Sequence, residues 1–392
     1  MAWMIREDKL DQYQREFINN ESRKKGSIWI KGFAGSGKSV LLVHHARSVL
    51  QREPAAKIVL LVYTLALVDL FRAALRELGI EDKVLVTTYY DFCRGSDRYD
   101  YVLCDEVQDL PRKALESMKS RAGQVIVAGD SNQSIYDVDV KWKHPVVSPS
   151  EIGDILDARP FTLSIVHRLT RSVIRAVNSL LPAMNIWGTA NDPQKQDVQI
   201  RIGEAQTTET EVEYVWMKAQ ERPQITGGME TSVVLLPSHK LIAEFFDTLL
   251  TVTGKPVWSK VKNNYGKPDY DNLNSHLKKN GLKIQFVGNG NGSLQDAVIN
   301  HNVLVMTYHS AKGLDFDDVF LPYLSASTSI ARERGDVLFM VAMTRSRRNL
   351  YITHTGYCHE YVSRFANMDA CANIDIDAAV SPPKQGGIVY DF

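Results

Sequence analysis

The sequence predicts an α/β protein of two lobes, each built on a mainly parallel sheet covered by helices. β-rich runs alternate with longer amphipathic runs over the first 160 residues, and a second such series follows. A polar, proline-containing stretch at 137–160 separates the two series. The length of 392 residues also allows two domains of usual size. We therefore expect one lobe over residues 1–158, a second over 159–370 and a tail over 371–392.

The expected strands are short runs rich in β-branched and apolar residues. In the first series they are SIWI (27–30), KIVLLVY (57–63), KVLVTTY (83–89), YDYVLCDE (99–106) and QVIVAGD (124–130). In the second they are FTLSIV (161–166), DVQIRI (197–202), TSVVLLP (231–237), NVLVMTY (302–308), DDVFLPY (317–323) and NLYITH (349–354). Helical periodicity lies between them, as at 169–181 and 241–250. Residues 259–300 are rich in Asn, Gly and Lys, so we expect a loop-rich insertion there, and we expect the tail after Ala372 to pack poorly.

Composition limits the classes of function. Lys plus Arg and Asp plus Glu number 46 each, so the charge balance neither favours nor excludes a nucleic-acid partner. The N-terminus lacks the apolar core of a signal peptide, and no run reaches the roughly 18 apolar residues of a membrane span. The four cysteines have neither disulfide-framework nor metal-ligand spacing. We expect a soluble, cytoplasmic protein with reduced thiols and no membrane partner.

A phosphate-binding motif follows the first expected strand. The residues GFAGSGKS (32–39) match GxxxxGK[ST] and lie between that strand and the helical run VLLVHHARSVL. Backbone N–H groups of such a loop and of the helix N-terminus surround phosphate oxygens. The motif predicts a nucleotide site formed by Gly32, Gly35, Ser36 and Gly37, with Lys38 on the β- and γ-phosphates and Ser39 on Mg²⁺.

A pair of acids follows the apolar strand YVLC (101–104). Asp105 is expected at the carboxyl edge of the sheet beside the phosphates, where it can hold Mg²⁺. Glu106 can then polarise a water molecule as general base. An acid pair at a strand end is by itself most often a solvated turn, but its place beside the phosphate loop favours hydrolysis.

From Leu10 to about Ile352 the sequence resembles the UvrD/Rep/PcrA-like superfamily 1 DNA helicases. Seven motifs occur in the family's order: LDQYQ (10–14), GFAGSGKS (32–39), DEVQD (105–109), VIVAGDSNQSIY (125–136), LSIVHRL (163–169), TYHSAKGLDFDDVFLP (307–322) and VAMTRSRRNLYI (341–352). The resemblance implies two RecA-like parallel-sheet lobes with the ATP site between them.

The resemblance also implies roles for single residues. Gln14 would read the adenine edge, and Gln133 would sense the γ-phosphate. Arg168 and Arg345 would act as arginine fingers, because cations from the second lobe can stabilise the charge that develops on phosphates bound by the first.

Three departures from the family pattern stand out. His167 occupies the place of a base-stacking tyrosine, and Asp315, beside Gly313 at the nucleotide, replaces a glutamate expected near the ribose. The family's tryptophan-containing WRGA after QSIY is missing, since the chain reads DVDV at 137–140, and Trp142 is the nearest substitute. The first two departures concern nucleotide selectivity, and the third concerns the path of the nucleic acid.

A single strand of nucleic acid needs aromatic and hydroxyl groups on both lobes. The resemblance assigns this path to Tyr63, Thr64, Thr88, Tyr89, Thr307 and His309. An aromatic residue at a strand end is as often a core residue as a stacking platform. About 40 residues separate Thr64 from Asp105, which leaves no room for the accessory domain that relatives carry there.

The leading interpretation is an ATP- and Mg²⁺-dependent single-stranded-DNA translocase or helicase, and the motifs GDSNQSIY and KGLDF favour 3′ to 5′ movement. One alternative is a nucleic-acid-activated ATPase subunit of a larger defence or repair complex, with a nuclease as partner. Another is a nucleotide-gated clamp that hydrolyses poorly. RNA in place of DNA stays open, because the expected contacts are to backbone and base faces.

Overall fold

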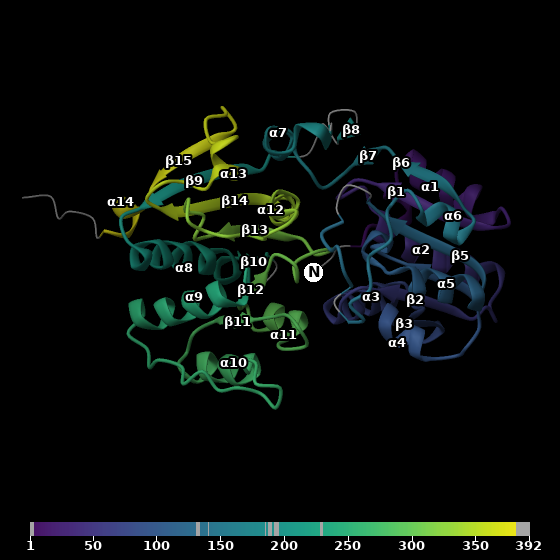
Figure 1. The fold of residues 1–392 in the computed structure, drawn as a ribbon, viewed down its shortest axis with the longest axis horizontal. Helices are drawn as coiled ribbons and strands as arrows, with labels where there is room; N and C mark the ends of the chain where they lie inside the picture. The colour runs from purple at the N-terminus through teal and green to yellow at the C-terminus, as the bar shows by residue number, and fades with distance from the viewer. Residues whose placement is uncertain are drawn as a thin grey trace, which may run out of the picture.

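The computed structural model describes residues 4–130, 134–139, 141–184, 186, 190–191, 196–227 and 230–381. Two α/β lobes lie side by side, one coloured purple to blue and the other mainly green to yellow (Figure 1). Each lobe contains one parallel sheet with helices packed on it. The predicted fold class is therefore confirmed.

The first lobe is built on a six-stranded sheet in the order β3-β2-β4-β5-β1-β6. Its strands are β1 (Ser27–Gly32), β2 (Ile58–Val62), β3 (Val84–Thr88), β4 (Tyr99–Cys104), β5 (Ala122–Gly129) and β6 (Ala158–Leu163). Its helices are α1 (Gln12–Asn19), α2 (Lys38–Arg52), α3 (Leu65–Glu77), α4 (Tyr89–Arg94), α5 (Arg112–Arg121) and α6 (Ile152–Leu156). β2 is buried along its whole length, because helices cover both faces of a parallel sheet.

Strand β6 corrects the expected order of elements. The run 161–166 was expected in the second lobe, but β6 pairs with β1, with Phe161 opposite Ile30. The Phe161 ring also lies 5.2 Å from the ring of Phe17 on α1. The proline-containing stretch at 137–160 thus returns the chain to the first sheet, which extends beyond the expected boundary at residue 158.

The second lobe is built on a seven-stranded sheet in the order β11-β12-β10-β13-β14-β9-β15. Its strands are β9 (Gln199–Ala205), β10 (Ser232–Leu236), β11 (Ile284–Phe286), β12 (Val303–Thr307), β13 (Phe316–Leu321), β14 (Ser346–Thr355) and β15 (Cys371–Asp375). Its helices are α7 (Arg171–Leu180), α8 (Thr208–Ile225), α9 (His239–Val252), α10 (Tyr270–Lys279), α11 (Leu294–Ile299), α12 (Gly335–Met343), α13 (Glu360–Ser363) and α14 (Ile376–Val380). Two short strands, β7 (Ile165–Val166) and β8 (Ala190–Asn191), pair outside both sheets.

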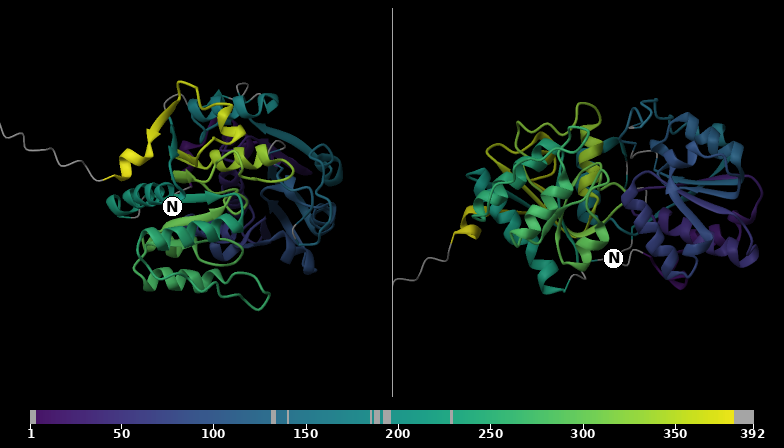
Figure 2. Two further views of the ribbon diagram at one scale, coloured as in Figure 1. Left: turned by 60° about the vertical axis from the view of Figure 1, so that its left-hand side comes forward. Right: turned by 90° about the horizontal axis from the view of Figure 1, so that it is seen from below.

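Two segments expected to be loosely packed belong to this lobe. Within 259–300, α10 buries Leu273 and Leu277, and the Tyr270 ring stacks on Phe286 of β11 at 3.9 Å. The expectation of a surface insertion is therefore wrong, since the polar residues lie in turns and on one face of α10. The expected poor packing after Ala372 is also wrong as far as Val380, because β15 pairs with β9 and Ile376 is fully buried. In both views of Figure 2 the yellow C-terminal segment lies against the second lobe.

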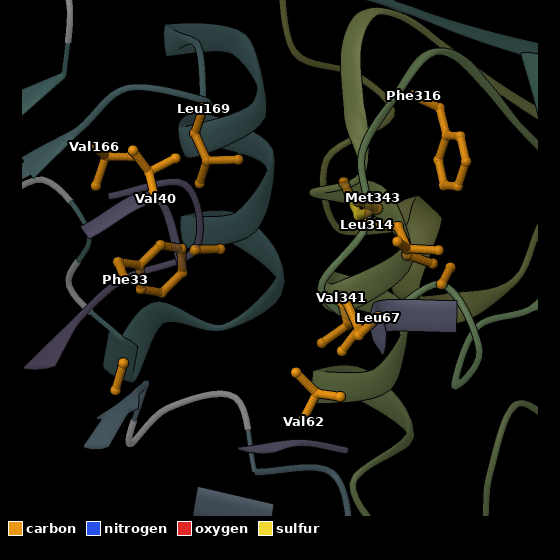
Figure 3. Close-up of a cluster of buried hydrophobic side chains, with 14 of the residues drawn as sticks. Phe33, Val40, Val62, Leu67, Val166, Leu169, Leu314, Phe316, Val341 and Met343 are labelled. Carbon is orange, nitrogen blue, oxygen red and sulfur yellow. The ribbon is translucent and has the colours of Figure 1, made fainter. Parts of the chain in front are cut away.

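Hydrophobic and polar contacts join the two lobes. One cluster of buried side chains includes Leu67 of α3 and Val341 of α12, both labelled in Figure 3. Leu67 also packs on Gly313, where an added Cβ would lie 3.1 Å from its methyl group. Arg334 of the second lobe donates to the carbonyl of Ser134 at 2.7 Å. Among the residues that the structure describes, no helix is long and apolar enough to cross a membrane.

Candidate nucleotide site between the lobes

The loop between β1 and α2 has the shape that its glycines predict. Gly35 and Gly37 have φ angles of 78° and 83°, a left-handed conformation that glycine adopts without strain. A Cβ at Gly35 would clash with Arg168 of the LSIVHRL motif, and a Cβ at Gly37 would clash with the amide of Gln14. The two glycines therefore allow both the turn and the close approach of two other motifs.

Lys38, the first residue of α2, folds back over this loop. Its Nζ donates to the carbonyls of Gly32 at 2.8 Å and Phe33 at 3.1 Å. The ammonium group is thus held over the loop that is expected to surround the phosphates.

Ser39 and Asp105 meet at the carboxyl edge of the first sheet. The Ser39 hydroxyl donates to Oδ2 of Asp105 at 2.6 Å. Burial and the neighbouring charge of Glu106 raise the pKa of Asp105 to about 6, although Ser39 and Lys38 favour its ionised form. Two hard oxygen ligands at one buried point, with an unfavourable negative charge, fit a divalent cation such as Mg²⁺. This pair is therefore suited to the metal site that the motifs predict.

Glu106 has a left-handed backbone, with φ at 54°, which is uncommon for a residue with a side chain and is often found at functional sites. Gln108 donates to its carboxylate and accepts a hydrogen bond from the N–H of Asp130 at 3.0 Å. Burial alone would raise the pKa of Glu106, but the charges of Lys312 and Lys38 outweigh it and hold the pKa below its usual value. Glu106 is therefore ionised at neutral pH, as a general base must be.

A buried ion pair joins the two lobes at this carboxylate. Nζ of Lys312, in the loop after β12, contacts Oδ2 of Asp109 and lies 3.8 Å from Oε2 of Glu106. The Lys312 side chain is 5% exposed and that of Asp109 is fully buried. No role was predicted from the sequence for Lys312, Asp109 or Gln108. All three residues lie inside the DEVQD and KGLDF motifs, so these motifs could have identified them.

Arg168 contacts the first lobe through a backbone hydrogen bond, and its charge interacts with a carboxylate of that lobe. The N–H groups of His167 and Arg168 both donate to the carbonyl of Gly35, at 2.8 and 3.2 Å. Burial lowers the pKa of Arg168, whereas the charges of Asp315 and Glu106 oppose that shift. The guanidinium therefore lies in the field of carboxylates from both lobes.

Arg345 is almost fully buried, at 1% exposure. Its guanidinium donates to the carbonyls of Val341 at 2.7 Å and Leu314 at 3.1 Å, both within the second lobe. Burial and repulsion from Arg168 lower its pKa well below the usual value, although Glu106 raises it. The charges of both expected fingers thus act on Glu106, while the N–H groups of Arg345 donate to two backbone carbonyls and to the Thr344 hydroxyl at 3.0 Å.

Gln14 lies under the phosphate loop in a fixed orientation. Its side chain accepts from the N–H of Asp11 at 3.1 Å, in the capping box of α1, and donates to the carbonyl of Ser36 at 3.1 Å. Nε2 of His167 lies 2.7 Å from Oδ2 of Asp11. Oδ2 of Asp315 lies 3.8 Å from Nε of Arg347. The role of Gln14 at the adenine stays a prediction. Gln133 lies outside the described residues.

Three residues expected on the strand path, Tyr63, Tyr89 and His309, form a column of rings across the lobes together with Tyr136, which was not assigned to that path. The Tyr63 ring stacks between those of Tyr89 at 5.4 Å and Tyr136 at 5.0 Å. The Tyr136 ring lies 5.5 Å from that of His309 in the second lobe. Tyr89 is 3% exposed, so it supports the column from inside the first lobe.

The expected hydroxyl residues have local structural partners. Thr64 and Thr88 are the N-caps of α3 and α4, accepting from the N–H groups of Leu67 and Asp91. Thr307 accepts from the N–H of Ser310 at 3.0 Å. Contact of these threonines with nucleic acid stays a prediction.

Two family models match the chain. Residues 28–175 match the viral superfamily 1 RNA helicase core domain, and residues 259–357 match the UvrD-like helicase C-terminal domain. No curated protein sequence matches the chain. The two matches confirm the resemblance to superfamily 1 helicases.

Solved helicase structures are similar to the chain at low sequence identity. The arterivirus nonstructural protein 10 helicase has 16% identity and a TM-score of 0.45, covering 86% of this chain and 61% of its own. The PRRSV helicase has 14% identity and a TM-score of 0.43, with 84% and 52% coverage. The arterivirus helicase in complex with DNA has 15% identity and a TM-score of 0.42, with 83% and 60% coverage. The chain therefore spans less than two thirds of the length of each.

Proposed function

We propose that this chain, which resembles superfamily 1 helicases in both lobes, hydrolyses ATP between its lobes and uses the lobe movement to travel along single-stranded DNA. The observation that carries the proposal is the place of Nζ of Lys312, 3.8 Å from the carboxylate of Glu106, where the charges of Arg168 and Arg345 also act. Each lobe supplies only part of the chemistry, so hydrolysis would require the lobes together. A change of phosphate charge would then change the contact between them.

Each residue of the first lobe's site would have its own chemical role. Ser39 and Asp105 would hold Mg²⁺, which neutralises phosphate charge when bound. Lys38 would exchange the carbonyls of Gly32 and Phe33 for the β- and γ-phosphates. Ionised Glu106 would accept a proton from the attacking water.

The two arginines would stabilise charge on the transferred phosphoryl group. Arg168 already contacts the phosphate loop through its backbone. Arg345 would exchange its hydrogen bonds to the carbonyls of Val341 and Leu314 for phosphate oxygens. This exchange would link nucleotide binding to the position of α12.

We further propose 3′ to 5′ movement, on the form of the GDSNQSIY and KGLDF motifs. RNA is a second candidate substrate, because residues 28–175 match a viral RNA helicase core domain. The segment between Thr64 and Asp105 is too short to hold an accessory domain. We therefore propose that the chain alone opens duplexes poorly and relies on a partner such as a nuclease or on a preformed gap. Each base-pair step costs about 1.4 kcal/mol to unstack.

The test is streptavidin displacement from either end of single-stranded DNA and RNA, together with strand separation on tailed duplexes. We expect displacement from the 5′ end of DNA, little strand separation, and neither activity in Glu106→Gln. Displacement only from the 3′ end would refute the polarity, and displacement only on RNA would refute the choice of DNA. Efficient strand separation by the isolated chain would refute the reliance on a partner.

A further inference from the structure

Exposed lysines gather at one edge of the second lobe, on the segment between α9 and α10, on α10 itself and just after it. Figure 1 shows α10 at the lower edge of that lobe. We call this region the lysine surface, and it consists of Lys255, Lys260, Lys262, Lys267, Lys278, Lys279 and Lys283, all of them exposed. Residues 253–283 hold these seven lysines against two acids, Asp269 and Asp271, so they carry five net positive charges in a chain with none.

Most of this charge has no acid beside it. Among the residues that the structure describes, one ion pair involves these lysines, between Nζ of Lys260 and Oδ2 of Asp247 at 2.7 Å. A dense set of like charges repels itself, and a bound polyanion relieves that repulsion. The lysine surface therefore fits a partner that carries many negative charges.

Local contacts hold the segment that carries the first four lysines. Trp258 is 5% exposed, and its indole N–H donates to the side-chain oxygen of Asn272 on α10 at 2.9 Å. The turn that follows is closed by the N–H of Asn263, which donates to the carbonyl of Lys267 at 2.8 Å. The lysines thus stand on an ordered backbone, so binding would cost little further ordering of the chain.

The residue types select the kind of polyanion. Lysine is depleted at interfaces between proteins, whereas it is a common partner of backbone phosphates. A single strand also needs rings on which its bases stack. Between α9 and α10, a segment that the structure describes in full, Tyr265 is the one exposed ring. Cations without stacking rings match a duplex, whose bases are already stacked and whose strands together carry one charge per about 1.7 Å of helix axis.

A short series of side chains leads from the lysine surface to the boundary between the lobes. The hydroxyl of Tyr270, the first residue of α10, lies 2.9 Å from Nδ1 of His239. Burial and the charge of Lys267 lower the pKa of His239. Burial also lowers the pKa of His309, to which the charge of His239 contributes. His309 lies 5.5 Å from an aromatic ring of the first lobe, so a strand between the lobes would pass close to the lysine surface.

We propose that the lysine surface binds the phosphate backbone of duplex nucleic acid that adjoins the strand held between the lobes. The lysines pair with phosphates and read no base, so the surface binds duplexes of any sequence. The inference rests on the proposed function, because the travelling chain brings the duplex to this edge of the second lobe. Binding of a duplex does not itself require hydrolysis.

The test measures binding of two fluorescein-labelled probes by fluorescence anisotropy, without nucleotide and over a series of salt concentrations. One probe is a blunt duplex of about 20 base pairs, or two helical turns, prepared as DNA and as RNA. The other is a single strand of the same length. We expect Lys262→Gln with Lys267→Gln to reduce the slope of log K against log salt by about 1.8 on a duplex, because each lost phosphate contact contributes about 0.9.

The same loss of contacts sets the change in affinity. At about 0.1 M salt, the duplex should bind this double variant at least tenfold more weakly, since two contacts fewer lower log K by up to about 1.8. The single strand should lose less than about twofold, because its grip residues lie between the lobes. Both lysines are exposed, so the variant should fold, which thermal unfolding would check.

Two control variants accompany the test. Lys262→Arg with Lys267→Arg keeps both charges and should retain the wild-type slope. Lys24→Gln with Lys25→Gln removes two exposed lysines of the first lobe, which precede β1, whereas the phosphate loop follows that strand. This matched variant should bind both probes as the wild type does.

An unchanged slope and affinity for both duplexes in the double glutamine variant of the lysine surface would refute the proposal. An equal loss on the single strand would also refute it, because the lysines would then belong to the strand path. A loss on the DNA or the RNA duplex supports the proposal and identifies the duplex that the surface binds.

The proposed function is judged separately, by wild-type ATP hydrolysis with and without the single strand. The double variant should keep the wild-type stimulation, since neither lysine belongs to the nucleotide site. Absence of stimulation in the wild type would refute the proposed function, while binding of the blunt duplex would still decide the lysine surface.

Discussion

Replacing Lys312 by alanine removes a buried cation that joins the two lobes. In the structure its ammonium pairs with Asp109 and lies 3.8 Å from the carboxylate of Glu106. Without Lys312, two acids would stay buried at the boundary with less opposing charge. Separation of the lobes would hydrate Asp109 again, so we expect the cost to fall on assembly of the site and not on the fold of either lobe.

The magnitude follows from the burial of the pair. Removing one partner of a buried ion pair costs about 3–5 kcal/mol. At about 1.4 kcal/mol for each factor of ten, kcat/KM for ATP should fall by roughly 10²- to 10⁴-fold. Burial would also raise the pKa of Glu106 once Lys312 no longer opposes it. The acidic limb of the pH profile of kcat should therefore move to higher pH.

The assay is steady-state ATP hydrolysis across the pH range, with thermal unfolding as a check on the fold. Lys312→Arg keeps the charge and should retain most of the turnover. Asp109→Asn in the Lys312→Ala background removes the unpaired carboxylate and should restore part of the loss. Wild-type turnover and an unmoved acidic limb in Lys312→Ala would show that this contact is absent from the hydrolysing state.

Three further predictions concern single side chains. Lys38→Ala should weaken ATP binding, measured by equilibrium titration, because Lys38 is the cation on the phosphate loop; unchanged affinity would contradict its role. Arg345→Ala should lower kcat by about 10³ while sparing nucleotide affinity, since a finger acts on transition-state charge, and a loss confined to affinity would argue against a finger. Burial raises the pKa of Glu211 to about 7, against an ordinary 4.5, although Thr353 and Tyr323 hydrogen-bond it. Its contribution to stability is full below pH 4.5 and is lost as pH rises through about 7. Glu211→Gln should therefore raise Tm at about pH 8 and change it little at about pH 5, and equal shifts at both would refute the assignment.

The fold was largely predictable because strands buried on both faces leave continuous apolar runs in the sequence. β2 and β10 are such strands, and both were found. The sheet to which a strand belongs is a long-range property, so nothing in the run 161–166 indicated pairing with β1. The Asn- and Lys-rich composition of 259–300 hid the amphipathic helix α10, whose buried residues are spaced by one turn.

The conformation of the phosphate loop was predictable because one motif contains the whole turn, as at Gly35, Gly37 and Lys38. The contact between Lys312 and Asp109 joins residues that are far apart in the chain, so no local pattern gives it. The capping roles of Thr64 and Thr88 depend on where α3 and α4 begin, which the strand-like runs before them did not reveal.

The most direct test of a two-lobe ATPase is hydrolysis by the wild type and by Glu106→Gln, each with and without single-stranded DNA, double-stranded DNA and RNA. We expect wild-type hydrolysis to need Mg²⁺ and to rise strongly with single-stranded DNA. Glu106→Gln should still bind ATP but hydrolyse it roughly 10²- to 10⁴-fold more slowly, the usual loss when a general base is removed. Unchanged turnover in Glu106→Gln would contradict the assignment of Glu106 and the site built around it.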